Sequence, residues 1–127
     1  MKYLFATLLF LVLQPAFSQT GEVEELVTLY RNEAINGDQN TLVFNHDLQQ
    51  LEIGDHLIPV SNNTLLSFSK GKGKNLGIVN FMLQKGTAVT SKTDPTYRRA
   101  SYSIEFRSGK AAKRFLALLE QLKKPRV

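Results

Sequence analysis

The spacing of apolar residues predicts a helix at each end of a β-rich segment. Across residues 21–37 apolar side chains recur every three or four positions, as on one face of an amphipathic helix. Acidic residues crowd its first turn, where the helix dipole favours negative charge, and Gly37 stands where a C-terminal glycine is expected. The expected core stripe is Val23, Leu26, Val27, Tyr30 and Ala34.

From residue 41 onward the hydrophobic period changes to two, which predicts about seven short antiparallel strands. Residues 99–107 alternate most clearly, whereas 76–83 are apolar on both faces and indicate a strand covered on both sides. We expect 76–83 to form a hairpin with 87–91. The other expected strands are 41–45, 48–53, 56–60 and 64–68.

A second amphipathic helix is expected at 109–124. Ser108 can cap its first turn, Lys123 and Lys124 lie in its last turn, where the dipole favours cations, and Pro125 ends it. The residues expected to face the core are Ala111, Ala112, Phe115, Leu118, Leu119 and Leu122.

The order of strands and closing helix over 41–124 resembles the pleckstrin-homology-like fold. The stretch that carries the resemblance is "YSIEFRSGKAAKRFLALLEQL", a last strand that enters a helix through a polar turn. The resemblance implies an α+β domain in which antiparallel sheets form a barrel-like sandwich. Many members of that fold bind peptides or proteins. It also implies that the helix closes the barrel mouth with Phe115, Leu118, Leu119 and Leu122.

The chain departs from that family at two places. It has no Trp, which the closing helix of the family usually carries. Where lipid-binding members have a basic motif between the first two strands, residues 45–48 read "NHDL". Phosphoinositide binding is therefore not implied. The layout is also similar to that of small, exported, uncharacterised bacterial proteins, a likeness that brings no activity with it.

The first residues predict a secretory signal peptide. Lys2 precedes the apolar run 3–13, Pro15 interrupts it, and "AFS" at 16–18 offers small residues for cleavage after Ser18. An uncleaved membrane anchor is the competing interpretation, but a spanning helix needs about 20 apolar residues. No Cys follows the run, so a lipoprotein is not expected. We therefore expect a secreted or periplasmic protein.

The expected organisation is a signal peptide at 1–18, a helical segment at 19–40 and the β-rich domain with its closing helix at 41–127. The chain has no cysteine, which excludes thiol catalysis, thiolate metal sites and disulfides. Small secreted animal domains usually rely on disulfides, so their absence points to a bacterial protein.

Charge is segregated along the chain. Residues 21–60 hold eight acidic residues against Arg31 alone, whereas 61–127 hold fourteen Lys and Arg against three acidic residues. Two interpretations remain open. Either a basic face meets an anionic partner, or the acidic and basic segments fold against each other and cancel locally.

The stretch "SFSKGKGKNLG" at 67–77 is the first candidate site, with Lys70, Lys72 and Lys74 among glycines. It fits neither the P-loop nor the dinucleotide-binding spacing of glycines. A strand is expected to follow it, so no helix N-terminus is expected there for a phosphate. We interpret it as a basic turn between two strands, with a polyanion contact as the alternative.

Arg98 and Arg99 beside Tyr97 are the second candidate for an anionic partner. At strand spacing the two arginines point to opposite faces, which argues against one flat patch. The candidates for polyanion binding are thus Lys70, Lys72, Lys74, Arg98 and Arg99.

His46, Asp47, Asp55 and His56 have the chemistry of a zinc site, and a small metal-dependent hydrolase is one hypothesis. Solvated turn histidines are the preferred interpretation. Neither G-x-S-x-G nor H-E-x-x-H occurs, and no enzyme, metal or cofactor is expected. The sequence favours a non-enzymatic binding module for a protein or peptide. A binder of envelope polymers, lipid headgroups or nucleic acid is the alternative.

Overall fold

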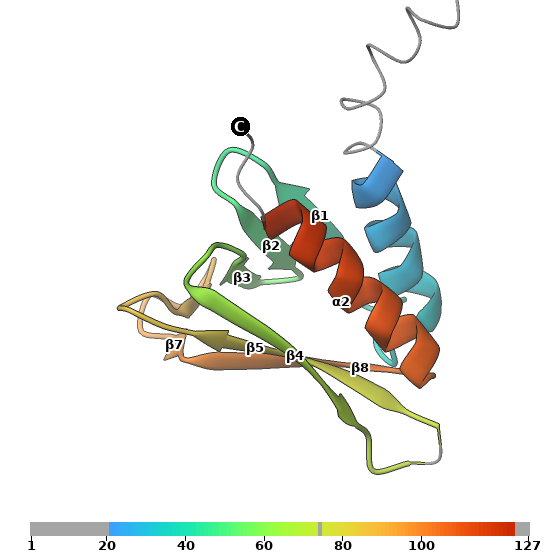
Figure 1. Ribbon diagram of the computed structural model, residues 1–127. Coiled ribbons are helices and arrows are strands. Elements are labelled where there is room, and N and C mark those ends of the chain that lie inside the picture. The colour runs from blue at the N-terminus through green and yellow to red at the C-terminus, as the bar shows by residue number, and fades with distance from the viewer. Residues whose placement is uncertain (1–20, 74, 124–127) are drawn as a thin grey trace, which may run out of the picture.

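A computed structural model describes residues 21–73 and 75–123 (Figure 1). Helix covers 21–33, and the chain ends in helix α2 (Gly109–Lys123), with the strands between them. The predicted signal peptide at 1–18 and the candidate Lys74 lie outside the described residues.

The strands of the described chain form two antiparallel sheets. The larger has the order β1-β2-β3-β6-β7 and the smaller the order β4-β5-β8. This α+β sandwich with a helix at each end confirms the predicted class, although the sheets do not close into a barrel. The strands are β1 (Leu42–Asn45), β2 (Gln50–Ile53), β3 (His56–Pro59), β4 (Thr64–Lys70), β5 (Gly77–Leu83), β6 (Val89–Ser91), β7 (Arg98–Arg99) and β8 (Ser101–Phe106).

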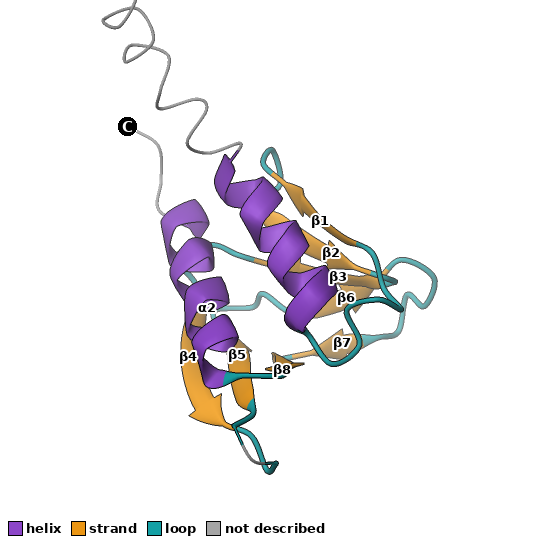
Figure 2. Cartoon of the chain, turned by 90° about the vertical axis from the view of Figure 1, so that its right-hand side faces the viewer, coloured by secondary structure: helices purple, strands orange, loops and turns teal. Residues whose placement is uncertain are grey.

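The core lies between the helices and the sheets (Figure 2). The helix at 21–33 lies beside α2, and the Phe115 ring of α2 contacts the rings of Tyr30 and Phe106, with centroids 6.4 and 4.9 Å away. All six residues expected to form the core face of α2 are buried. The Ser108 cap is also confirmed, because its Oγ accepts a hydrogen bond from the Ala111 N–H at 3.1 Å.

The N-terminal helix ends earlier than the predicted residue 37. At its end the chain turns to pair with β8: the Ile35 N–H donates to the Glu105 carbonyl, and the Arg107 N–H donates to the Glu33 carbonyl. Two backbone hydrogen bonds around an isolated bridge between Ala34 and Phe106 thus replace another helical turn. They also cover the outer edge of β8 at that end.

The predicted hairpin between 76–83 and 87–91 is wrong. β5 pairs with β4 and β8, whereas β6 pairs with β3 and β7. Lys85 and Gly86 both adopt positive φ angles, of 55° and 81°, and turn the chain from the small sheet to the large one. In its place in the large sheet, Val89 of β6 is fully buried.

Candidate functional site

The basic turn singled out in the sequence joins β4 to β5 and lies against the start of α2. The prediction of a turn between two strands is confirmed by the pairing of Lys70 with Gly77. The expectation that no helix N-terminus lies nearby is wrong, because the Gly109 N–H donates to the Asn75 carbonyl at 3.1 Å. The helix is contributed by a later part of the chain and meets the turn only in the folded protein.

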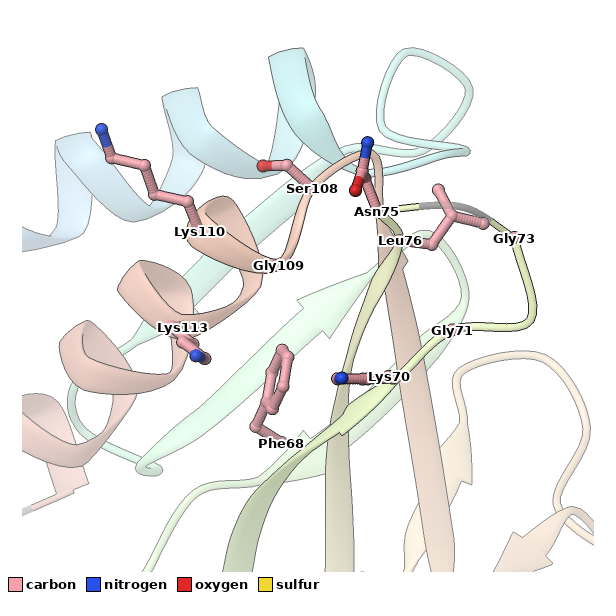
Figure 3. Close-up of a pocket in the computed structure, with 10 residues that line it drawn as sticks. All are labelled: Phe68, Lys70, Gly71, Gly73, Asn75, Leu76, Ser108, Gly109, Lys110 and Lys113. Atoms are coloured by element: carbon pink, nitrogen blue, oxygen red, sulfur yellow. The ribbon is translucent and has the colours of Figure 1, made fainter.

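A hollow of about 700 Å³ opens between this turn, β4 and the first turn of α2 (Figure 3). The ring of Phe68 lies in it, and the side chains of Lys70 and Lys113 flank that ring. The Lys113 ammonium lies 5.0 Å from the Phe68 ring centroid, a cation–π distance. Lys110 also lines the hollow, but its side chain extends away from the ring. The site is therefore cationic with an aromatic floor.

Gly77, which follows the turn, is needed for close packing between β5 and α2. A Cβ on Gly77 would lie 2.8 Å from both the Gly109 Cα and the Ala112 Cβ, and 3.0 Å from the Phe68 ring. Only glycine lets β5 approach α2 this closely. Close packing and phosphate binding both call for glycine, so a glycine-rich composition alone does not distinguish them.

The N–H groups at the start of α2 are already largely used within the chain. Gly109 donates to Asn75, Ala111 donates to the Ser108 side chain, and Ala112 donates to the Ser108 carbonyl at 3.2 Å. The attraction of this hollow for anions therefore comes mainly from the lysine ammonium groups.

The hollow adjoins the free edge of β4, which bonds to β5 on one side only. At one end of the strand the Gln84 N–H donates to the Asn63 carbonyl, and at the other the Gly71 N–H donates to the Leu76 carbonyl. In an antiparallel pair every second residue bonds to the neighbouring strand. Leu65, Ser67 and Ser69 therefore bond to β5, and the residues between them point their N–H and C=O groups outward.

Three residues keep these outward groups available. The groups of Thr64 are used, because its N–H donates to the Ser61 carbonyl and its carbonyl accepts from the Lys123 ammonium at 2.9 Å. Within the described residues the outward groups of the next three alternate positions have no hydrogen-bond partner. These positions are Leu66, Phe68 and Lys70.

The edges of the other outer strands are shorter or partly occupied. β1 has four residues and β7 has two, whereas β4 has seven. The outer edge of β8 is occupied near Glu105 by the turn after the N-terminal helix. Within the described part of the chain, β4 is the longest open edge.

The two groups of polyanion candidates lie at opposite ends of β5. Lys70 pairs with Gly77 at the start of β5, and Lys72 lies in the turn just before it. Arg98 and Arg99 lie just before Ser101, which pairs with Met82 near the other end of β5. The Arg98 guanidinium donates to the Gly86 carbonyl at 2.6 Å. That of Arg99 lies 4.8 Å from the Tyr97 ring centroid. The candidates therefore do not form one continuous patch.

The hypothesis of a zinc site at His46 and His56 is not supported by the topology. His46 follows the pair Asn45–Gln50, whereas His56 pairs with Ile53 at the other end of β2. The Asp55 carboxylate instead accepts hydrogen bonds from the Ser91 and Thr93 hydroxyls, which lower its pKa. No group of three or more potential metal ligands occurs in 21–73 and 75–123.

Ion pairs join the acidic and basic halves of the chain. The Arg114 guanidinium bonds to both carboxylate oxygens of Glu25 at 2.6 and 2.7 Å, and it lowers the pKa of that carboxyl group. Lys92 pairs with Glu52 at 3.0 Å. Part of the segregated charge therefore cancels in the fold, as the second interpretation of the charge pattern expected.

Sequence reasoning missed Phe68, Lys110 and Lys113 as parts of the site. The two lysines are one helical turn apart at the start of α2, a pattern that by itself is typical of a solvated helix face. Their proximity to Lys70 depends on how α2 docks on the small sheet, which no local pattern encodes.

No family model, curated protein or solved structure matches the chain. None of the helices in the described residues is long and apolar enough to cross a membrane.

Proposed function

We propose that this chain is an exported, non-enzymatic binding module that holds an extended peptide segment of a partner along the edge of β4. The observation that carries the proposal is the row of outward N–H and C=O groups at Leu66, Phe68 and Lys70. Such a row is the template used when a peptide adds a strand to a sheet.

The side chains of the same residues support peptide binding. Leu66 and Phe68 are half-buried and lie on the face of β4 that is turned toward α2. They leave apolar surface beside the open edge, where alternate side chains of an added strand would lie. The resemblance to the pleckstrin-homology-like fold agrees with this proposal, since many members of that fold bind peptides.

The geometry favours a peptide over an extended polyanion. Binding of a polymer calls for a continuous basic stripe, but the lysines of the hollow and the pair Arg98 and Arg99 lie at opposite ends of β5. The open edge of β4, with lysines at one end, fits a short extended chain better.

The test removes one outward donor. Peptides are first selected from a display library on the wild-type protein, and their affinity is then measured for Leu66→Pro and Leu66→Ala. Proline is tolerated on an edge strand where its nitrogen faces away from the neighbouring strand. It removes the donor and places its ring where the added strand would bond. We expect Leu66→Pro to weaken binding about tenfold more than Leu66→Ala, which lacks the side chain but keeps the N–H.

Circular dichroism and thermal unfolding establish that both variants are folded. Equal affinities of two folded variants for the selected peptides would show that the β4 edge is not the binding surface.

A further inference from the structure

We infer that the segment bound along β4 is acidic and that its carboxylates meet Lys70 and Lys113 in the hollow. This inference rests on the proposed function and specifies the chemistry of the partner.

The open edge of β4 continues into the hollow. Lys70 is the last residue of β4 and one of the three with outward backbone groups. Its side chain also lines the hollow, next to Phe68 (Figure 3). A strand that pairs with β4 as far as Lys70 therefore brings its next residues to the hollow.

The positive charges of Lys70 and Lys113 in the hollow are not compensated by ion pairs within the described residues. Within the described residues three basic side chains form ion pairs with carboxylates, namely Arg114 with Glu25, Lys92 with Glu52 and Lys123 with Glu120. Neither Lys70 nor Lys113 forms an ion pair with any described residue. Glu105, whose carboxylate lies near Gly71, belongs to the opposite face of the sheet, because it alternates with the buried Ile104 and Phe106.

The hollow suits carboxylates better than a compact phosphate. A compact phosphate at a helix start is held mainly by free backbone N–H groups. Here three of the first four backbone N–H groups of α2 already donate to acceptors within the chain. Two flexible ammonium groups on either side of an aromatic ring instead suit carboxylates whose aliphatic stems lie on Phe68.

The test compares the peptides selected on three proteins. The first is the wild type, the second is Lys70→Gln with Lys113→Gln, and the third is Arg98→Gln with Arg99→Gln. The third protein removes the same charge at the opposite end of β5. We expect Asp and Glu to be enriched toward one end of the peptides selected on the wild type and on the arginine variant only.

For the most enriched acidic peptide, we expect the lysine variant to lose about five- to tenfold in affinity and most of the salt dependence of binding. The arginine variant should stay within about twofold of the wild type. Selected peptides without an acidic preference, or with the same preference on the lysine variant, would overturn the inference and leave the proposed function standing.

A different result would overturn the proposed function itself. If no peptide is enriched on any of the three proteins, both the inference and the proposed function are overturned. Steeply salt-dependent binding of heparin or DNA in that case would assign the lysines to a polyanion.

Discussion

Replacing Phe115 with alanine is expected to lower the free energy of unfolding by about 3–5 kcal/mol. The Phe115 side chain is fully buried, and its ring contacts Phe106 of β8 and Tyr30 of the N-terminal helix. Its removal therefore leaves a cavity where both helices and the small sheet meet. Urea unfolding at neutral pH measures the loss.

The control for this change is Leu116→Ala on the same helix. Leu116 is only partly buried, so the cost of its removal should be clearly smaller. A cost for Phe115→Ala below about 1 kcal/mol would mean that α2 does not dock as described.

Replacing Gly77 with alanine is expected to cost about 1–3 kcal/mol, because the new methyl group overpacks a rigid contact. The Cβ would lie 2.8 Å from the Gly109 Cα and the Ala112 Cβ, so β5 and α2 must separate. The shift also displaces Phe68, whose ring lies 3.0 Å from the same position. We expect urea unfolding to show the lost stability and peptide affinity to fall with it.

Gly73→Ala is the matched control in the same turn. Its Cβ meets only the Leu76 side chain, at 2.5 Å from the Cδ1 atom, and that flexible group can move. Its cost should be small. If both alanine variants are equally stable, the close approach of β5 and α2 at Gly77 is disproved.

The sequence was most informative where local chemistry decides the structure. The spacing of Ala111, Phe115 and Leu118 predicted the buried face of α2, and Ser108 predicted its cap. These features depend on residues within one or two turns of each other, so local patterns contain them.

The sequence was less informative where distant segments meet. Residues 87–91 follow β5 closely, and proximity in the chain suggested a hairpin, but β6 joins the other sheet. The hollow likewise combines Lys70 with Lys113, which come from separate elements. Sheet membership and helix docking are set by burial of the whole core, which short-range periodicity does not encode.

The open edge of β4 is tested most directly by amide hydrogen exchange in the free protein, followed residue by residue by NMR. We expect the amides of Leu65 and Ser67, bonded to β5, to exchange slowly, and those of Leu66 and Phe68, directed outward, to exchange much faster. If all four amides were equally protected, another segment or a second copy would already pair with β4. That result would contradict the assignment of this edge as a free binding surface.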